Sequence, residues 1–291
     1  MWGMRVGSVI GMLVFLGTGA ACSLPRTDAD SVAKVYLLAG QSNMAGRAFG
    51  GDIASHPADA GIRIDYVCSF SGGSSQGGPP EPHRSAGWAP LGPAPKHSGT
   101  PASHFGPEIG LGRGLASRLP GRQIAFIKHG RGGTSLAVDW NPKAVTGPRL
   151  YHEFIEQSRS ALARLRAEGA RFDLEALIWC QGEADSTRLD WAEAYGANLR
   201  ALFAHIREDL AAPGLPIVVV LTGDGLSNTK MVHASLIRAA QRKVVGADTQ
   251  ALLVSGDDLT LFDGVHYDAR AQLELGRRLS QALRPRSRSF P

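Results

Sequence analysis

Residues 35–46 read Val-Tyr-Leu-Leu-Ala-Gly-Gln-Ser-Asn-Met-Ala-Gly, and this stretch indicates the fold. Val35 to Ala39 is a short apolar run with a β-branched and an aromatic residue at its start, which predicts a buried strand. Gly40 ends the run, and Ser42 follows it closely. Ligands bind outside the carboxyl ends of the strands in open parallel sheets, so a hydroxyl here is a candidate nucleophile. The alternative is structural, because Asn43 has a side chain that commonly caps helices.

The rest of the chain alternates apolar runs with amphipathic segments, and no hairpin signal or internal repeat interrupts this order. Further strands are expected at 62–67, 123–128, 174–180, 217–221 and 251–254, and helices at 105–119, 151–167, 189–210, 229–245 and 273–283. Strands that alternate with helices form a mostly parallel sheet with helices on both faces. The sequence therefore predicts a single three-layer α/β/α domain around a mostly parallel sheet of about five strands.

Polar residues recur where the expected strands end. The glycine-rich stretch 129–135 lacks the Gly-Lys-Ser/Thr of a phosphate loop, so it is either a plain tight turn or a turn that presents backbone N–H groups to the crevice. Residues 179–185 read Trp-Cys-Gln-Gly-Glu-Ala-Asp, which puts an amide and a carboxylate at a strand end. Asp263 and His266 lie around a glycine, and their spacing lets the carboxylate reach the near imidazole nitrogen. Asp-Gly turns near a histidine are also common without any catalytic role.

Together these stretches resemble the four sequence blocks of the SGNH hydrolases, most closely the branch of carbohydrate esterase family six and the sialate O-acetylesterases. The resemblance runs from Val35 to Asp268. It departs from the family at Cys180, where the third block usually has histidine. The resemblance implies a flavodoxin-like fold and a serine esterase that removes acetyl groups from sugars, with no metal ion or organic cofactor.

The resemblance also implies roles for the catalytic residues. Ser42 would be the nucleophile and His266 the general base that takes its proton. Asp263 would orient the imidazole and stabilise its charged form. Glu183 is an alternative partner for His266, or a brace for the oxyanion loop. We expect Asp263 to be the main orienting acid.

The same blocks imply an oxyanion hole. Its donors would be the backbone amide of Ser42, the amide of either Gly132 or Gly133, and the side chain of Gln181. The substrate would be an acetylated polysaccharide or a sialic acid. Two other functions stay open: an inactive surface module of the same fold that binds glycans, and an esterase that acts on a lipid or peptidoglycan ester.

The composition limits the possible partners. The formal net charge is +5, but no run of basic residues interleaved with aromatic ones occurs, so nucleic-acid binding is not indicated. His83, His97 and His104 lie at irregular spacing without a cysteine or carboxylate cluster, which argues against a metal site. They belong to a stretch rich in Gly, Pro and Ser at 69–104, which is too long for an ordinary connection. Trp88 is its large apolar residue, either on the rim of a substrate cleft or as the anchor of an exposed loop.

The N-terminus has the features of an export signal. Residues 1–21 combine Arg5, the apolar run 9–16 and small residues at 19–21. Cys22 follows directly, as in a bacterial lipoprotein, although glycine stands where the usual leucine precedes the cysteine. We therefore expect an exported protein, periplasmic or extracellular, whose only membrane anchor would be a lipid on Cys22.

The remaining boundaries follow from composition. We expect a linker at 22–33, the esterase domain at 34–284 and a disordered basic tail at 285–291. Cys68 and Cys180 then remain as a pair, either joined as a disulfide or present as two buried free thiols.

Overall fold

The computed structural model describes residues 1–3, 32–69, 82–95, 103–145, 149–224 and 229–283. The strands are β1 (Val32–Gly40), β2 (Ala48–Phe49), β3 (Ile62–Ser69), β4 (His83–Arg84), β5 (Ala89–Pro90), β6 (His104–Phe105), β7 (Ile124–Arg131), β8 (Arg171–Cys180), β9 (Ile217–Val220) and β10 (Ala251–Val254). The α-helices are α1 (Ser42–Ala45), α2 (Glu108–Arg118), α3 (Leu150–Ala167), α4 (Leu189–Asp209), α5 (Ala234–Gly246) and α6 (Ala269–Ala282). Short 3-10 turns are η2 (Gly50–Asp52), η3 (Asp59–Gly61) and η4 (Asp185–Thr187).

The main sheet has the strand order β10-β9-β8-β1-β7-β3-β4, and β5 also pairs with β3. The pairs from β10 to β3 are all parallel, whereas β4 and β5 pair antiparallel with β3. The predicted mostly parallel sheet is therefore confirmed. It has eight strands rather than about five. Six of them lie where strands were expected, and β4 and β5 were missed because they are too short to show an apolar period in the sequence.

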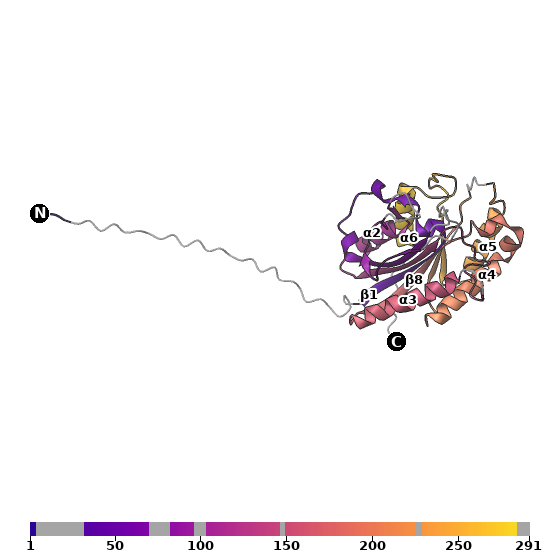
Figure 1. Ribbon diagram of the computed structural model, residues 1–291, viewed down its shortest axis with the longest axis horizontal. Coiled ribbons are helices and arrows are strands. Elements are labelled where there is room, and N and C mark those ends of the chain that lie inside the picture. Colours follow the sequence, from indigo (N-terminus) through magenta and orange to yellow (C-terminus); the bar gives the residue numbers. More distant parts are fainter. Residues whose placement is uncertain (4–31, 70–81, 96–102, 146–148, 225–228, 284–291) are drawn as a thin grey trace.

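Helices cover both faces of this sheet, as Figure 1 shows. Alternate residues of β1 point to opposite faces. Val35 and Leu37 pack with α3, α4 and α5, whereas Tyr36 and Leu38 pack with α2 and α6. All four side chains are buried, as expected for a central parallel strand. The three-layer prediction is confirmed, and β1 lies in the middle layer between β7 and β8.

Strand β7 extends through Arg131, beyond the strand expected at 123–128. Within it, Gly130 pairs with Gly40 of β1. A Cβ at Gly130 would lie 2.6 Å from the Cα atom of Ala45, so only glycine lets α1 approach the strand so closely. The glycine-rich turn therefore begins after β7 and is shorter than the sequence suggested.

Three helices begin elsewhere than expected. Helix α2 starts later because His104–Phe105 forms β6, which pairs with β2. Helix α5 begins at Ala234 instead of residue 229, since turns precede it. Helix α6 begins earlier, at Ala269, because Asp268 caps it: the Asp268 side chain accepts a 2.8 Å hydrogen bond from the Ala271 amide.

The described part of the stretch 69–104 is attached to the sheet. Strands β4 and β5 pair with β3, and Trp88 packs against the core beneath α3. The Arg63 guanidinium lies over the Trp88 ring, 5.2 Å from its centroid. These contacts support the interpretation of Trp88 as an anchor. His97 lies outside the described residues.

Cys68 and Cys180 are buried free thiols, so the disulfide alternative is wrong. Burial raises the pKa of the Cys68 thiol to about 11 and raises that of Cys180 as well. Both thiols are therefore protonated at neutral pH, which makes them poor nucleophiles.

Most of the expected terminal features lie outside the described residues: the signal at 4–21, Cys22 and the tail at 285–291. Strand β1 begins at Val32, so the domain boundary expected at residue 34 falls inside this strand. Among the helices of the described residues, none has the length and apolar character needed to cross a membrane.

Candidate active site

Ser42 lies in a tight turn at the carboxyl end of β1, which we call the serine turn (residues 41–46). Gly40, the last residue of β1, leads into the turn; its φ is 152°, and a Cβ there would lie 2.0 Å from the carbonyl oxygen of Cys180. Gln41 then donates its backbone N–H to that same carbonyl oxygen at 3.0 Å. Ser42 begins helix α1 and is only 4% exposed. The serine is thus fixed at the edge of the sheet where the parallel strands end.

The Ser42 hydroxyl meets an imidazole from the other end of the chain. His266 Nε2 lies 2.9 Å from Ser42 Oγ, and His266 Nδ1 lies 2.6 Å from Asp263 Oδ2. Because the carboxylate accepts the proton on Nδ1, Nε2 is left as an acceptor for the serine hydroxyl. The structure therefore brings together Ser42, His266 and Asp263 in one hydrogen-bonded chain, which we call the serine cluster.

The loop between β10 and α6 holds this pair in place. Asp263 Oδ1 accepts backbone N–H bonds from Val265 at 3.1 Å and from His266 at 2.8 Å. The Phe262 ring stacks on the imidazole, with centroids 5.9 Å apart. Burial raises the pKa of the Asp263 carboxyl, but the hydrogen bonds from His266 outweigh it, so the pKa lies below its ordinary value. Asp263 is accordingly ionised at neutral pH.

Glu183 has a different partner. Its carboxylate accepts a 2.8 Å hydrogen bond from the Asn43 side chain, and it is 4% exposed. Burial raises the pKa of Glu183, while the bonds from its own amide and from Asn43 oppose that shift. Of the two acids considered for His266, Asp263 is hydrogen-bonded to the ring and Glu183 is bonded to the serine turn.

The backbone amides of the two glycines in the predicted oxyanion turn differ in their hydrogen bonding. Gly132 donates its amide to the carbonyl oxygen of Ser69 at 2.9 Å. Gly133 has a φ of 68° and is exposed, and its amide makes no hydrogen bond among the described residues. The same holds for the Ser42 amide at the start of α1. Gly133 is therefore the better candidate of the two for an oxyanion donor.

The side-chain amide of Gln181 is already hydrogen-bonded to two other groups. Its side-chain amide donates to the Thr134 carbonyl oxygen at 3.1 Å and to Asp185 Oδ2 at 2.6 Å, which uses both N–H bonds. Its carbonyl oxygen Oε1 is buried without a partner among the described residues. Gln181 would have to release one of these bonds to reach an oxyanion.

Two buried residues at the site were not predicted as functional from the sequence. Asp185 accepts backbone bonds from Leu136 at 2.7 Å and from Ala137 at 2.9 Å, so it fixes the loop after the glycine turn. Burial raises the pKa of the Asp185 carboxyl to about 6, although the hydrogen bonds from these two amides lower it. Asn43 is not a helix cap, since α1 has no side-chain cap; it bonds Glu183 instead. The signal for both was their place within the matched blocks.

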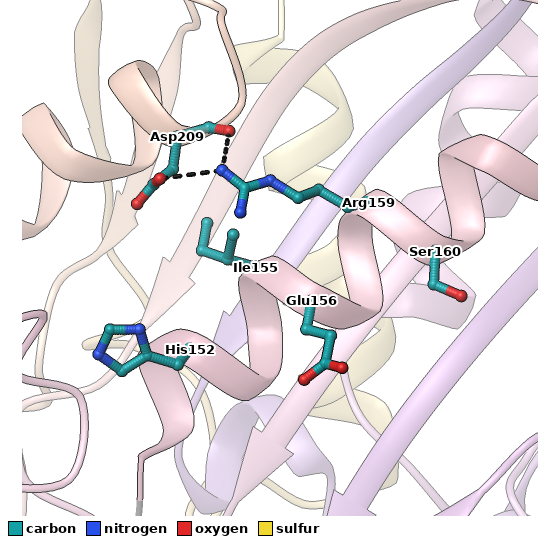
Figure 2. A pocket seen from close by; sticks show the side chains of 6 residues that line it. All are labelled: His152, Ile155, Glu156, Arg159, Ser160 and Asp209. Atoms are coloured by element: carbon teal, nitrogen blue, oxygen red, sulfur yellow. Dashed lines mark hydrogen bonds and ion pairs between the residues drawn. The ribbon is translucent and has the colours of Figure 1, made fainter.

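Other possible binding features lie apart from this cluster. Within the described ranges, no three His, Cys, Asp or Glu side chains converge so as to hold a metal ion. A hollow of about 600 Å³ is lined by side chains of α3 and by Asp209 of α4. Figure 2 shows these side chains, with the Arg159 guanidinium turned toward Asp209; the two groups are 2.9 Å apart. None of the residues that line it belongs to the serine cluster. A second hollow, of about 560 Å³, includes Arg131, which directly precedes the glycine turn.

The three-layer fold around a mostly parallel sheet is that of the SGNH-like hydrolase superfamily. Within it, the chain belongs to the carbohydrate esterase family described as sialic acid-specific acetylesterases, whose family model matches residues 32–284. Family membership supports esterase activity on carbohydrates. The sequence-based resemblance is therefore confirmed.

Known proteins agree with this assignment. A probable carbohydrate esterase of Arabidopsis thaliana is 28% identical over 179 residues, which cover 61% of this chain and 62% of that protein. The solved structure of an Arabidopsis thaliana protein matches with a TM-score of 0.61 and 24% identity, over 86% of this chain and 97% of the other. The solved structure of NanS matches with a TM-score of 0.58 and 17% identity, over 87% of this chain and 97% of NanS. The solved structure of a carbohydrate acetylesterase from Xanthomonas citri matches with a TM-score of 0.57 and 19% identity, over 86% of this chain and 55% of the other. At these identities the solved structures show a shared fold.

Proposed function

We propose that this protein is a serine esterase that removes O-acetyl groups from carbohydrates through an acyl-enzyme on Ser42. The observation that carries the proposal is the continuous chain from Ser42 Oγ through His266 to Asp263, with distances of 2.9 and 2.6 Å. A serine hydroxyl is a weak nucleophile until a neighbouring base takes its proton. This geometry supplies the base and the acid that orients it.

The reaction takes place in two halves. The Ser42 proton moves to His266 Nε2 while Oγ bonds to the acetyl carbonyl carbon, and the carbonyl oxygen becomes an oxyanion. His266 then gives the proton to the sugar oxygen as the ester C–O bond breaks, which leaves acetyl-Ser42. In the second half, water gives a proton to His266 as its oxygen bonds to the acetyl carbon. The bond between this carbon and Ser42 Oγ then breaks while His266 returns the proton to Oγ, which frees the serine and releases acetic acid, ionised to acetate at neutral pH.

The amides of Ser42 and Gly133 are the proposed oxyanion donors. Both are free of other hydrogen bonds among the described residues, whereas Gly132 donates to Ser69. One such donor is typically worth about 3–4 kcal/mol in the transition state. Gln181 supports the hole by holding the Thr134 carbonyl, and it would be a third donor only after giving up that bond or the bond to Asp185.

We further propose that the protein is exported, with Cys22 as the first mature residue and as the site of a lipid anchor. The support is the sequence of residues 1–22 alone. Export fits an acetylated polysaccharide or sialic acid outside the cytoplasm as the substrate.

The test of the activity joins a probe with a variant. The parent protein should react with a fluorophosphonate and release acetate from an aryl acetate, and Ser42→Ala should do neither while keeping its thermal stability. A parent that does not react would favour the inactive glycan-binding alternative. Residual activity in Ser42→Ala above a trace would show that another group is the nucleophile. A screen for acetate release from acetylated xylan, sialic acids and peptidoglycan would then identify the substrate class.

A further inference from the structure

A buried ion pair lies behind the serine turn, and the chemistry above does not use it. Lys128 on β7 and Glu108 at the start of α2 are joined by a 2.8 Å contact between Nζ and Oε1. Each side chain is only 3% exposed. No other ion pair found among the described residues has both partners so deeply buried.

Both members of the pair contact backbone around the serine turn. Lys128 Nζ donates a 3.0 Å hydrogen bond to the carbonyl oxygen of Ala45, the last residue of α1. The Glu108 carboxylate accepts the Gly106 amide, at 3.0 Å on one oxygen and 3.1 Å on the other. Gly46 lies directly against this segment, since a Cβ there would be 2.1 Å from the Gly106 nitrogen. The pair therefore connects the serine turn to β7 and to α2 at once.

Stability alone does not explain such a pair. Taking two charges out of water is costly, and well-packed apolar residues often replace a buried ion pair without loss of stability. The positive charge does have a local function here, because a cation at the carboxyl end of a helix meets carbonyl groups that lack helical partners. Ala45 closes the four-residue helix that begins with Ser42. The hydrogen bond from Lys128 to the Ala45 carbonyl therefore restrains the carboxyl end of this short helix.

We propose that Lys128 and Glu108 form a positioning pair that holds α1 in place, so that Ser42 Oγ keeps its 2.9 Å distance to His266 Nε2. Neither residue touches the reacting atoms. The inference rests on the proposed esterase function for its kinetic effect, but its structural effect can be measured without any activity.

The experiment removes both charges together, because a single buried charge left unpaired would destabilise the fold. The variant is Lys128→Met with Glu108→Gln. The matched control is Lys34→Met with Glu175→Gln, which removes a 2.7 Å pair at the opposite end of β1, where the side chains are 18% and 14% exposed. It also removes the 2.9 Å contact of Lys34 with Asp173, whose side chain is 43% exposed and keeps access to water. For each protein, kcat and KM on an aryl acetate are measured, together with amide hydrogen exchange of the peptide that contains residues 42–46.

We expect kcat of the Lys128/Glu108 variant to fall by about tenfold to a hundredfold with KM within about twofold, because misplacement of a reacting atom mainly affects the chemical step. Exchange at 42–46 should become faster in this variant, and both readouts should stay at the parent level in the control. Parental kcat and parental exchange in a folded variant would overturn the inference. A rise in KM with unchanged kcat would also overturn it.

A second variant covers the case in which the double variant does not fold. Glu108→Asp keeps both charges, so no buried charge is left unpaired, but it draws the carboxylate back by one methylene from Lys128 Nζ and from the Gly106 amide. It should slow fluorophosphonate labelling of Ser42 by a few-fold and loosen 42–46 slightly. Labelling and exchange at the parent level would overturn the inference. If the parent itself shows no esterase activity, the proposed function fails, while the exchange comparison still tests the positioning role.

Discussion

Replacement of Asp263 by asparagine should cripple the enzyme through the tautomer of His266. The backbone N–H groups of Val265 and His266 point at Oδ1 of Asp263, so an asparagine would keep its carbonyl oxygen there. Its NH₂ group would then face His266 Nδ1. Because that nitrogen would have to accept a hydrogen bond, the ring proton would move to Nε2, where it points at Ser42 Oγ. An imidazole in this form cannot take the serine proton.

The size of the effect follows from comparable triads. Loss of a buried orienting carboxylate lowers turnover by about ten thousandfold. The Asp263 side chain is 40% exposed, so water can partly replace it. We therefore expect kcat of Asp263→Asn to fall by about a thousandfold to ten thousandfold, which corresponds to roughly 4–5.5 kcal/mol in the activation barrier.

The matched control is Glu183→Gln, which is also neutral and similar in size. Its amide oxygen can still accept the bond from Asn43, so the serine turn keeps its contact and kcat should fall by about tenfold or less. Both variants are assayed on an aryl acetate, and thermal unfolding confirms that each is folded. If Glu183→Gln is the crippling change and Asp263→Asn is mild, the assignment of Asp263 as the orienting acid is wrong.

Three further outcomes are expected. Burial lowers the pKa of His129 from 6.5 to about 4, so the folded protein should lose up to about 3 kcal/mol of stability as the pH falls from 6.5 to 4. Between pH 6.5 and pH 4.5 the melting temperature of His129→Gln should therefore fall less than that of the parent. An equal fall in both proteins would contradict the lowered pKa of His129. Cys68 and Cys180 should resist a thiol reagent until the protein is denatured, and rapid reaction of either in the folded protein would contradict their burial. Mass spectrometry of the processed protein should show Cys22 as the first residue, with a diacylglycerol adduct. An unmodified Cys22 would contradict the proposed lipid anchor, and an intact Met1 would contradict the proposed export as well.

The layers of the fold could be predicted from the sequence because their signals are local. The apolar run of β1 and the amphipathic pattern of α3 each lie within one short window, and the alternation of such windows implies a parallel sheet. The boundaries of the helices and strands were predicted less accurately than their presence. Strand β7 continues through Arg131 because its backbone stays paired with β1 and β3, and α6 begins early because Asp268 caps it. Both causes depend on neighbours that a periodicity does not report.

The serine cluster could be predicted only because its residues stand in blocks that resemble a family. Asp263 and His266 are close in sequence, so their contact was foreseeable. The bonds that hold the site together join distant parts of the chain, such as Lys128 to Ala45 and Leu136 to Asp185. A buried polar side chain has no local signature, and its partner emerges only when the sheet is assembled.

Asn43 joins the segments that carry Ser42 and His266, and the proposed reaction depends on this connection. Ser42 is carried by the rigid central strand, whereas His266 is carried by a loop, so their separation depends on how two distant segments are joined. The Asn43 side chain donates to the Val265 carbonyl oxygen at 3.1 Å and accepts the Tyr267 amide at 3.2 Å, which are the residues on either side of His266. Asn43 therefore holds the histidine loop directly to the serine turn. A side chain that fulfils both bonds must present a donor and an acceptor on a short stem, which is the chemistry of asparagine.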